Sequence, residues 1–263
     1  MNEDLEMPPI RVPRAKRAFD LIAAMLLLPV WGPLLLIVGV LNMLVNGRPA
    51  FYISTRRVFA QQSSAVIKFR TMVLDADKIA NRTTMPVTAQ RFLNIAADSP
   101  LYTPLGRVIE RYFLTEIPQF LNLLAGSMSL IGNRPLPEDV ISSLKSAYPD
   151  VELRFVTRCG LSGPVQLVGR DVIDDGDRLR LEIAYARRCL HAYSITLDVM
   201  LAIYTVLILT RIKNPMSVEE VAARLDRWAE PFGFGKTVRF LQPQAVERNT
   251  TDKRKNPVGK GLL

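Results

Sequence analysis

Two turns that contain glycine and proline each hold an arginine, and both suit the binding of an anion. Arg134 lies between a Gly-Asn pair and Pro135, and Arg158 opens a second turn that ends at Pro164. A planar guanidinium in rigid surroundings favours bidentate binding of a phosphate. Glycines also let backbone N–H groups approach an anion, although neither turn has Walker or Rossmann spacing. The pattern indicates phosphate chemistry, while a solvated surface arginine is the ordinary alternative for either turn alone.

Cysteine and histidine offer little material for other chemistries. The chain has two cysteines, Cys159 and Cys189, and a single histidine, His191. Their spacing suggests neither a disulfide framework nor a zinc site, so two ordinary reduced thiols are expected. A catalytic triad or a zinc centre built on histidine is therefore disfavoured.

The composition is both apolar and basic, which indicates a membrane-associated protein with anionic partners. Of the 263 residues 49% are hydrophobic and 22% are charged, with a net charge of +9. Such a charge fits nucleic acid, an anionic membrane surface or phosphorylated substrates. No helix-turn-helix, zinc-finger or RNA-binding signature is present, and nucleic acid leaves the apolar segment unexplained. We therefore expect no nucleic-acid partner.

The longest apolar segment, residues 18–45, is long enough to span a bilayer as a helix. Pro29 and Pro33 lie in its middle, where lost backbone hydrogen bonds have no substitute in lipid. Basic residues flank both ends, at 11–17 and from residue 48 onward, which fits two flanks on the cytoplasmic side. This balance favours a re-entrant hairpin over a full span, and the segment's length argues against a signal peptide.

The remaining elements are predicted mainly as helices with one small β element. Short apolar runs at 50–53 and 65–67 predict two strands, and residues 81–104 are expected to be a surface excursion. Helical spacing over 105–124 is interrupted by Pro118, which predicts two helices or a proline in the first turn of the second. Further helices are predicted over 74–80, over 217–230, and over an apolar run at 196–209 that is too short for an ordinary span.

An ordered series of motifs makes the chain resemble the bacterial sugar transferases, small monotopic polyprenyl-phosphate phosphoglycosyl transferases. The resemblance covers roughly residues 14–212 and includes a complete match to the family's KFRTM box. The motif-bearing segments are residues 16–20, 49–52, 68–72, 114–119, 128–135 and 158–170. The series implies transfer of a sugar phosphate from a nucleotide sugar to polyprenyl phosphate, through a covalent intermediate on the aspartate of an Asp-Glu pair.

The same resemblance implies roles for individual residues. It assigns metal or proton handling to Glu116, with Mg²⁺ present if the protein is active. It places Thr115 where the family has its nucleophilic aspartate. The expected substrate- and phosphate-binding residues are Lys68, Arg70, Arg134, Arg158, Gln166 and Arg170.

The sequence departs from the family pattern at several polar positions. Thr115 is a much weaker nucleophile than an aspartate, and Asn133 and Cys159 replace two prolines. One alternative is an active transferase with a rearranged centre that uses Thr115, Glu116 or Asp98. The other is an inactive family member that acts as a membrane scaffold or binds a substrate or a partner glycan-assembly protein.

Together these features predict a mainly helical α/β fold in the bacterial inner membrane, with its soluble part facing the cytoplasm. The N-terminal hairpin and amphipathic interfacial helices are expected to anchor it. The predicted parts are a basic segment (1–15), a membrane hairpin (16–47), a sugar-transferase-like domain (48–212), a helical extension (213–242) and a disordered basic tail (243–263).

Overall fold

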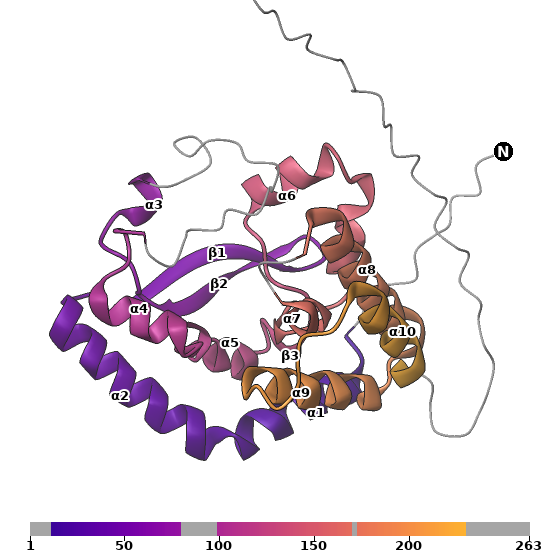
Figure 1. The fold of residues 1–263 in the computed structure, drawn as a ribbon, viewed down its shortest axis with the longest axis horizontal. Coiled ribbons are helices and arrows are strands. Elements are labelled where there is room, and N and C mark those ends of the chain that lie inside the picture. The colour runs from indigo at the N-terminus through magenta and orange to yellow at the C-terminus, as the bar shows by residue number, and fades with distance from the viewer. Residues whose placement is uncertain (1–11, 80–98, 170–172, 230–263) are drawn as a thin grey trace, which may run out of the picture. The chain divides into compact units, whose positions relative to one another are not determined.

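A computed structural model describes residues 12–79, 99–169 and 173–229. These residues are mainly helical and contain two two-stranded sheets (Figure 1), in agreement with the predicted fold class. The elements in chain order are α1 (Arg14–Leu26), α2 (Leu28–Asn46), β1 (Phe51–Phe59), β2 (Gln62–Phe69), α3 (Ala76–Ile79), α4 (Pro104–Arg111), η1 (Leu114–Glu116), α5 (Gln119–Ala125), β3 (Ser129–Ile131), α6 (Glu138–Lys145), η2 (Pro149–Phe155), β4 (Gly160–Ser162), α7 (Pro164–Val168), α8 (Asp175–Ala192), α9 (Ile195–Leu209) and α10 (Val218–Ala229).

The N-terminal apolar segment forms two helices that meet at Leu27. Pro29 lies in the first turn of α2, where a missing N–H costs little, whereas Pro33 lies inside that helix. The indole Nε1 of Trp31 donates to the carbonyl of Ala24 at 2.9 Å. A side chain therefore satisfies one of the backbone acceptors that the interruption of the helix leaves open.

Helix α2 presents most of its apolar side chains to the outside. Leu36 is 68% exposed and Leu44 is 73% exposed, although both are large hydrophobic residues. By length and composition α2 is the one helix in the described part of the chain that is able to cross a membrane. Its opposite face packs on α4 and α5, where Trp31 stacks on Phe120 with ring centroids 5.2 Å apart.

The predicted β element is confirmed as the antiparallel hairpin β1–β2, in which Phe51 pairs with Phe69. Helices α4 and α5 lie between this hairpin and α2 (Figure 1). Asn122 in α5 fixes the helix to β2, because its Nδ2 donates to Ala65 O at 2.7 Å and its Oδ1 accepts from Ile67 N at 3.1 Å.

The interruption predicted at Pro118 is confirmed, because α5 begins directly after it, and Gly126, with a φ of +81°, caps the end of that helix. The helix predicted over 74–80 is shorter in the structure and begins at Ala76. Of the predicted surface excursion at 81–104, residues 81–98 lie outside the described residues, and Pro104 already belongs to α4.

The two arginine-bearing turns meet at the short parallel pair β3–β4. Ser129 pairs with Gly160, and Gly132 N donates to Ser162 O at 2.7 Å. A Cβ on Gly160 would lie 2.2 Å from the backbone nitrogen of Gly132, so the two chains approach too closely for any side chain there. This contact brings two segments that are about 30 residues apart in the sequence to one place.

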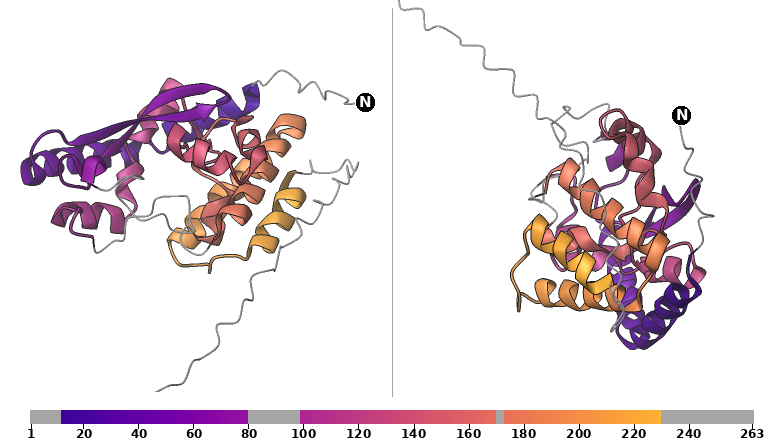
Figure 2. Two further views of the ribbon diagram at one scale, coloured as in Figure 1. Left: turned by 90° about the horizontal axis from the view of Figure 1, so that it is seen from above. Right: turned by 90° about the vertical axis from the view of Figure 1, so that its right-hand side faces the viewer.

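Helices α8, α9 and α10 gather on the side away from the β1–β2 hairpin in both views of Figure 2. The N-terminus of α1 is tied to this group through a buried lysine. Lys16 Nζ donates to Asp198 in α9 at 2.6 Å, to Tyr185 in α8 at 2.9 Å and to the carbonyl of Ile131 at 2.7 Å. Both charged side chains are fully buried.

Candidate functional site

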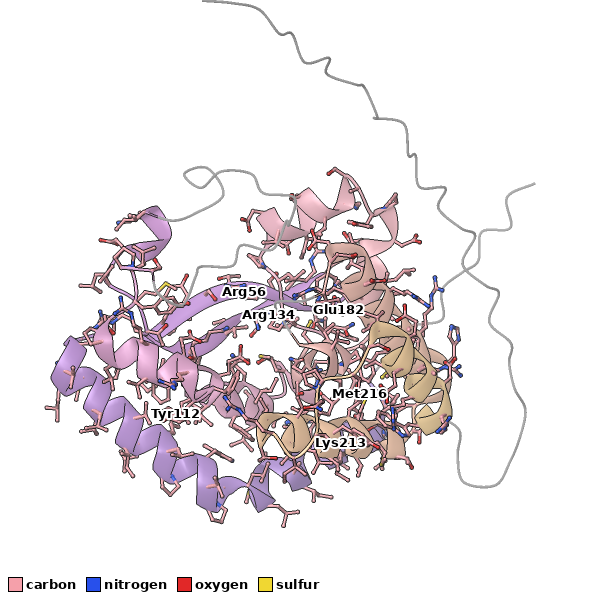
Figure 3. The ribbon with its side chains drawn as sticks, in the orientation of Figure 1. Arg56, Tyr112, Arg134, Glu182, Lys213 and Met216 are labelled. Atoms are coloured by element: carbon pink, nitrogen blue, oxygen red, sulfur yellow. The ribbon has the colours of Figure 1, made fainter. Side chains whose placement is uncertain are left out.

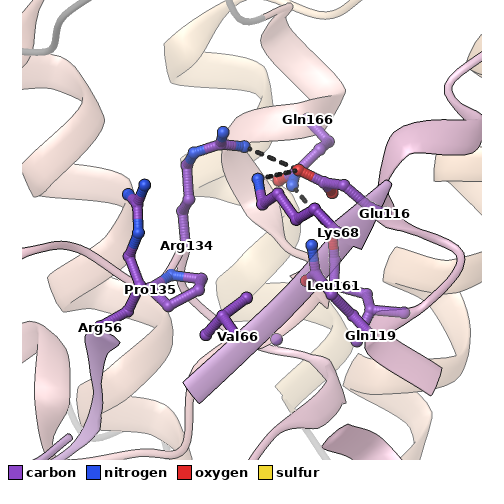
Figure 4. Close-up of a pocket in the computed structure, with 10 residues that line it drawn as sticks. Arg56, Val66, Lys68, Glu116, Gln119, Arg134, Pro135, Leu161 and Gln166 are labelled. Carbon is purple, nitrogen blue, oxygen red and sulfur yellow. Dashed lines mark hydrogen bonds and ion pairs between the residues drawn. The ribbon is translucent and has the colours of Figure 1, made fainter. Parts of the chain in front are cut away.

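A polar pocket opens where the β1–β2 hairpin, η1 and the two arginine-bearing turns meet. Figure 4 shows it from close by, and Figure 3 shows Arg56 and Arg134 near the centre of the described fold. The residues that line it are Arg56, Val66, Lys68, Glu116, Gln119, Arg134, Pro135, Gly160, Leu161 and Gln166. Lys68, Glu116, Arg134 and Gln166 were each predicted from the sequence, and the fold brings these four together.

Glu116 is the only carboxylate among the described residues of the pocket. Its Oε1 accepts from Lys68 Nζ at 3.3 Å and from Arg134 Nη1 at 3.2 Å, as the dashed lines in Figure 4 mark. Arg56 rises from β1 beside Arg134. Among the described residues, the pocket is thus lined by three cations and one carboxylate, an excess of positive charge that attracts a multiply charged anion.

Burial disfavours the charged forms of Lys68 and Arg56, so both side chains gain from a nearby anion. Burial lowers the pKa of Lys68 from 10.5 to about 8, with Glu116 opposing that shift. Burial also lowers the pKa of Arg56, and the neighbouring Arg134 adds to the effect. A bound phosphate would favour the charged form of both groups.

Thr115, at the position implied for the nucleophile, lies just before Glu116 in η1 but does not line the pocket. The preceding turn is sharp, because Phe113 adopts a left-handed conformation with a φ of +57°. Thr115 is 6% exposed, and its Oγ1 is buried with no hydrogen-bond partner. Neighbouring residues of a helical turn point in different directions, so only one of the pair reaches the pocket.

Two of the predicted phosphate-binding arginines lie elsewhere. Arg70 is buried, and its guanidinium donates to the carbonyls of Pro49, Asn46 and Gly47, which closes the turn after α2. Arg158 is half-buried and lies over the ring of Phe59. The structure therefore does not bring these two to the pocket.

Arg170 and Asp98, which were also predicted to act at the site, lie outside the described residues. Sequence reasoning missed Arg56, which precedes Arg57 on strand β1. The available signal was the alternation of side chains along a strand. Arg57 binds Glu138 and Glu152 on one face of β1, so its neighbour Arg56 points to the opposite face, where the pocket lies.

The chain resembles known proteins over most of its length. The family model described as bacterial sugar transferase matches residues 12–212. The exopolysaccharide production protein ExoY of Sinorhizobium fredii is 30% identical over 196 residues, which cover 73% of this chain and 84% of that protein.

Two longer relatives match the same part of the chain. The undecaprenyl-phosphate glucose phosphotransferase of Komagataeibacter xylinus is 32% identical over 200 residues, and the chain spans 35% of its length. The UDP-N-acetylgalactosamine-undecaprenyl-phosphate N-acetylgalactosaminephosphotransferase of Aeromonas hydrophila is 29% identical over 192 residues, and the chain spans 42% of it. The family match covers more than half of this chain, and the chain belongs to the bacterial sugar transferase family.

Proposed function

We propose that this protein transfers a sugar phosphate from a nucleotide sugar to a polyprenyl phosphate, with release of the nucleoside monophosphate, in exopolysaccharide or other glycan biosynthesis. The observation that carries the proposal is the pocket in which Lys68 and Arg134 contact the carboxylate of Glu116 and Arg56 stands beside Arg134. The named activities of the relatives from Aeromonas and Komagataeibacter support it. They also favour an active enzyme over an inactive scaffold.

In this proposal the three cations hold the diphosphate of the nucleotide sugar. Charge develops on the phosphate oxygens during phosphoryl transfer, and fixed cations in a partly buried pocket stabilise it without reorganising. The diphosphate competes with Glu116 for Lys68 and Arg134, whose contacts to that carboxylate are already long. Substrate binding would thus leave the Glu116 carboxylate facing the reacting phosphate.

The pocket also suits a Mg²⁺ ion carried by the substrate. No three acidic, cysteine or histidine side chains cluster as metal ligands in the described ranges. Mg²⁺ is commonly held by one or two carboxylates together with substrate phosphates, so Glu116 alone fits this need. When bound, the ion would neutralise part of the diphosphate charge.

We also propose that α1 and α2 form the predicted re-entrant hairpin on the cytoplasmic side of the inner membrane. Support comes from both ends of the segment, which contact different parts of the same compact unit. Lys16 at one end binds Asp198, and Asn42 near the other end donates to the carbonyls of Ala50 and Arg70. A helix that crossed the bilayer would have its ends on opposite faces.

The topology is testable with Arg14→Cys and Arg48→Cys variants in intact spheroplasts, treated with a membrane-impermeant maleimide. Both introduced thiols should stay unlabelled until the membrane is opened. The native Cys159 and Cys189 are buried and give a low background. Labelling of one introduced thiol from outside would mean a full span.

Release of UMP tests the proposed activity directly, with the purified protein in nanodiscs, undecaprenyl phosphate, Mg²⁺ and a panel of UDP-sugars. We expect the wild type to turn over and Glu116→Gln to lose about 100-fold or more in rate. Glu219→Gln, an exposed substitution in α10, is the matched control and should keep full activity. Absence of release from the wild type together with release from Thr115→Asp would contradict the proposal and identify an inactive scaffold.

A further inference from the structure

A second hollow adjoins the phosphate pocket on the other side of Arg134, and we call it the notch. Arg134 and Gln166 line both hollows. The other residues that line the notch are Gly132, Asn133, Pro164, Val165, Arg178 and Glu182. Figure 3 shows Arg134 and Glu182 close together near the centre of the described fold.

Asn133 lines the notch and carries a hydrogen-bond acceptor that no group in the described part of the chain uses. Its Nδ2 donates to the carbonyls of Arg154 and Glu182, both at 2.9 Å. Two carbonyl acceptors fix the orientation of the amide, because a flipped amide would set oxygen against oxygen. Oδ1 is left buried with no hydrogen-bond partner in a residue that is 1% exposed.

A buried hydrogen-bond acceptor without a donor costs free energy. A ligand group that supplies the missing donor is therefore favoured in the notch. Phosphate oxygens at neutral pH have no hydrogen to donate to Oδ1, so a phosphate does not satisfy this acceptor. Arg178, whose side chain carries hydrogen-bond donors and no acceptor, lines the same notch. The matching group must therefore donate one hydrogen bond and accept another, as a hydroxyl does.

We propose that the notch receives a hydroxyl group of the sugar while the neighbouring pocket holds the diphosphate. This inference rests on the proposed function and adds a determinant of sugar specificity, Asn133. In this arrangement the hydroxyl donates to Asn133 Oδ1 and accepts from Arg178. No aromatic side chain lines the notch among the described residues, which disfavours a stacked nucleobase as its occupant.

Binding measurements with Asn133→Ala separate the sugar from the rest of the donor. We expect this variant to bind UDP as the wild type does and to bind its preferred UDP-sugar about tenfold more weakly. Arg178→Gln should weaken UDP-sugar binding in the same selective way. Arg180→Gln, on the more exposed side of the same helix, is the matched control and should change neither affinity.

Fluorinated donors test the same contact without altering the protein, which matters if Asn133→Ala does not fold. Fluorine in place of a hydroxyl does not donate a hydrogen bond. A series of UDP-sugars fluorinated at one position each should contain one member that the wild type binds about tenfold more weakly. Asn133→Ala, if folded, should bind that member and the parent sugar equally.

Other outcomes overturn the inference. Equal weakening of UDP and UDP-sugar by Asn133→Ala would assign the notch to the nucleotide. Unchanged affinity for all donors would mean that water fills the notch. A change confined to the KM for undecaprenyl phosphate would assign it to the lipid. Failure of the wild type to bind UDP at all would instead count against the phosphate pocket, and therefore against the proposed function.

Discussion

The interior ion pair of Lys16 and Asp198 and the pocket around Glu116 differ in how completely their charges are satisfied. In the interior, Asp198 accepts from Lys16 at 2.6 Å, from Tyr185 at 2.7 Å and from Tyr193 at 2.9 Å. In the pocket, Glu116 contacts Lys68 and Arg134 only at 3.2–3.3 Å, and its side chain is 20% exposed.

This difference separates a structural cluster from a binding cluster. The interior cluster has one lysine facing a carboxylate that three donors surround, so it has no capacity left for a ligand. The pocket cluster has long contacts and an excess of cations, so an anion that enters gains interactions there. The first should therefore govern stability, and the second should govern affinity and rate.

The largest expected effect is on stability, at the interior cluster. Lys16→Met leaves the buried carboxylate of Asp198 without its cation and should destabilise the fold by about 3–5 kcal/mol. Thermal unfolding in detergent measures this change. Lys145→Met, which removes the exposed partner of Glu152, is the control and should cost less than about 1 kcal/mol. Similar unfolding temperatures for the two variants would contradict the structural role of Lys16.

The next effect is on affinity, at the pocket cluster. Arg134→Gln removes a cation that faces the bound phosphates and should weaken UDP binding about 10- to 100-fold. The unfolding temperature should change little, because the contact of Arg134 to Glu116 is long and partly exposed. Arg111→Gln, at the exposed end of α4, serves as the control. If Arg134→Gln instead lost much stability and kept its affinity for UDP, the pocket cluster would be structural and the comparison would be wrong.

The pH dependence sharpens the comparison further. The pKa of Lys68 is lowered to about 8, mainly by burial, so its amine loses its charge as the pH rises through that value. An anion binds the charged form better, and affinity for a UDP-sugar should fall about tenfold between pH 7 and pH 9. Calorimetry at both pH values measures this fall. Lys68→Met should remove most of the dependence, and an unchanged slope in that variant would assign the titration to another group.

The smallest expected effect concerns Thr115, whose buried hydroxyl has no partner. Thr115→Val keeps the shape and removes that hydroxyl, so stability should be unchanged or up to about 1 kcal/mol higher. Because the side chain does not line the pocket, UMP release should also be unchanged. Loss of UMP release in a stably folded Thr115→Val variant would identify the hydroxyl as a catalytic group.

Sequence patterns predicted the elements that local chemistry decides. Short β-branched and apolar runs predicted the β1–β2 hairpin, and Pro118 predicted the break before α5. Family motifs identified Glu116, Lys68 and Arg134 as site residues, and the pocket brings these three together.

Other features depend on tertiary contacts that a sequence pattern does not contain. Lys68 and Arg70 belong to one motif, but β2 ends at Phe69, so the chain turns and Arg70 binds carbonyls near α2 instead. Asn133 was visible only as a departure from a family proline. The orientation of its amide, on which the proposed role rests, is set by the carbonyls of Arg154 and Glu182, which come from η2 and α8.

The buried contact between Lys16 and Asp198 has a consequence for biosynthesis. The two residues are 182 positions apart, so the contact has to wait until α9 has left the ribosome. Synthesis proceeds from the N-terminus, and α1 and α2 emerge long before their partners. Under the proposed membrane topology, lipid would cover the apolar side chains of α2 during that interval. Insertion of the hairpin would therefore precede closure of the domain, and the bilayer would serve as the surface on which the rest of the chain folds.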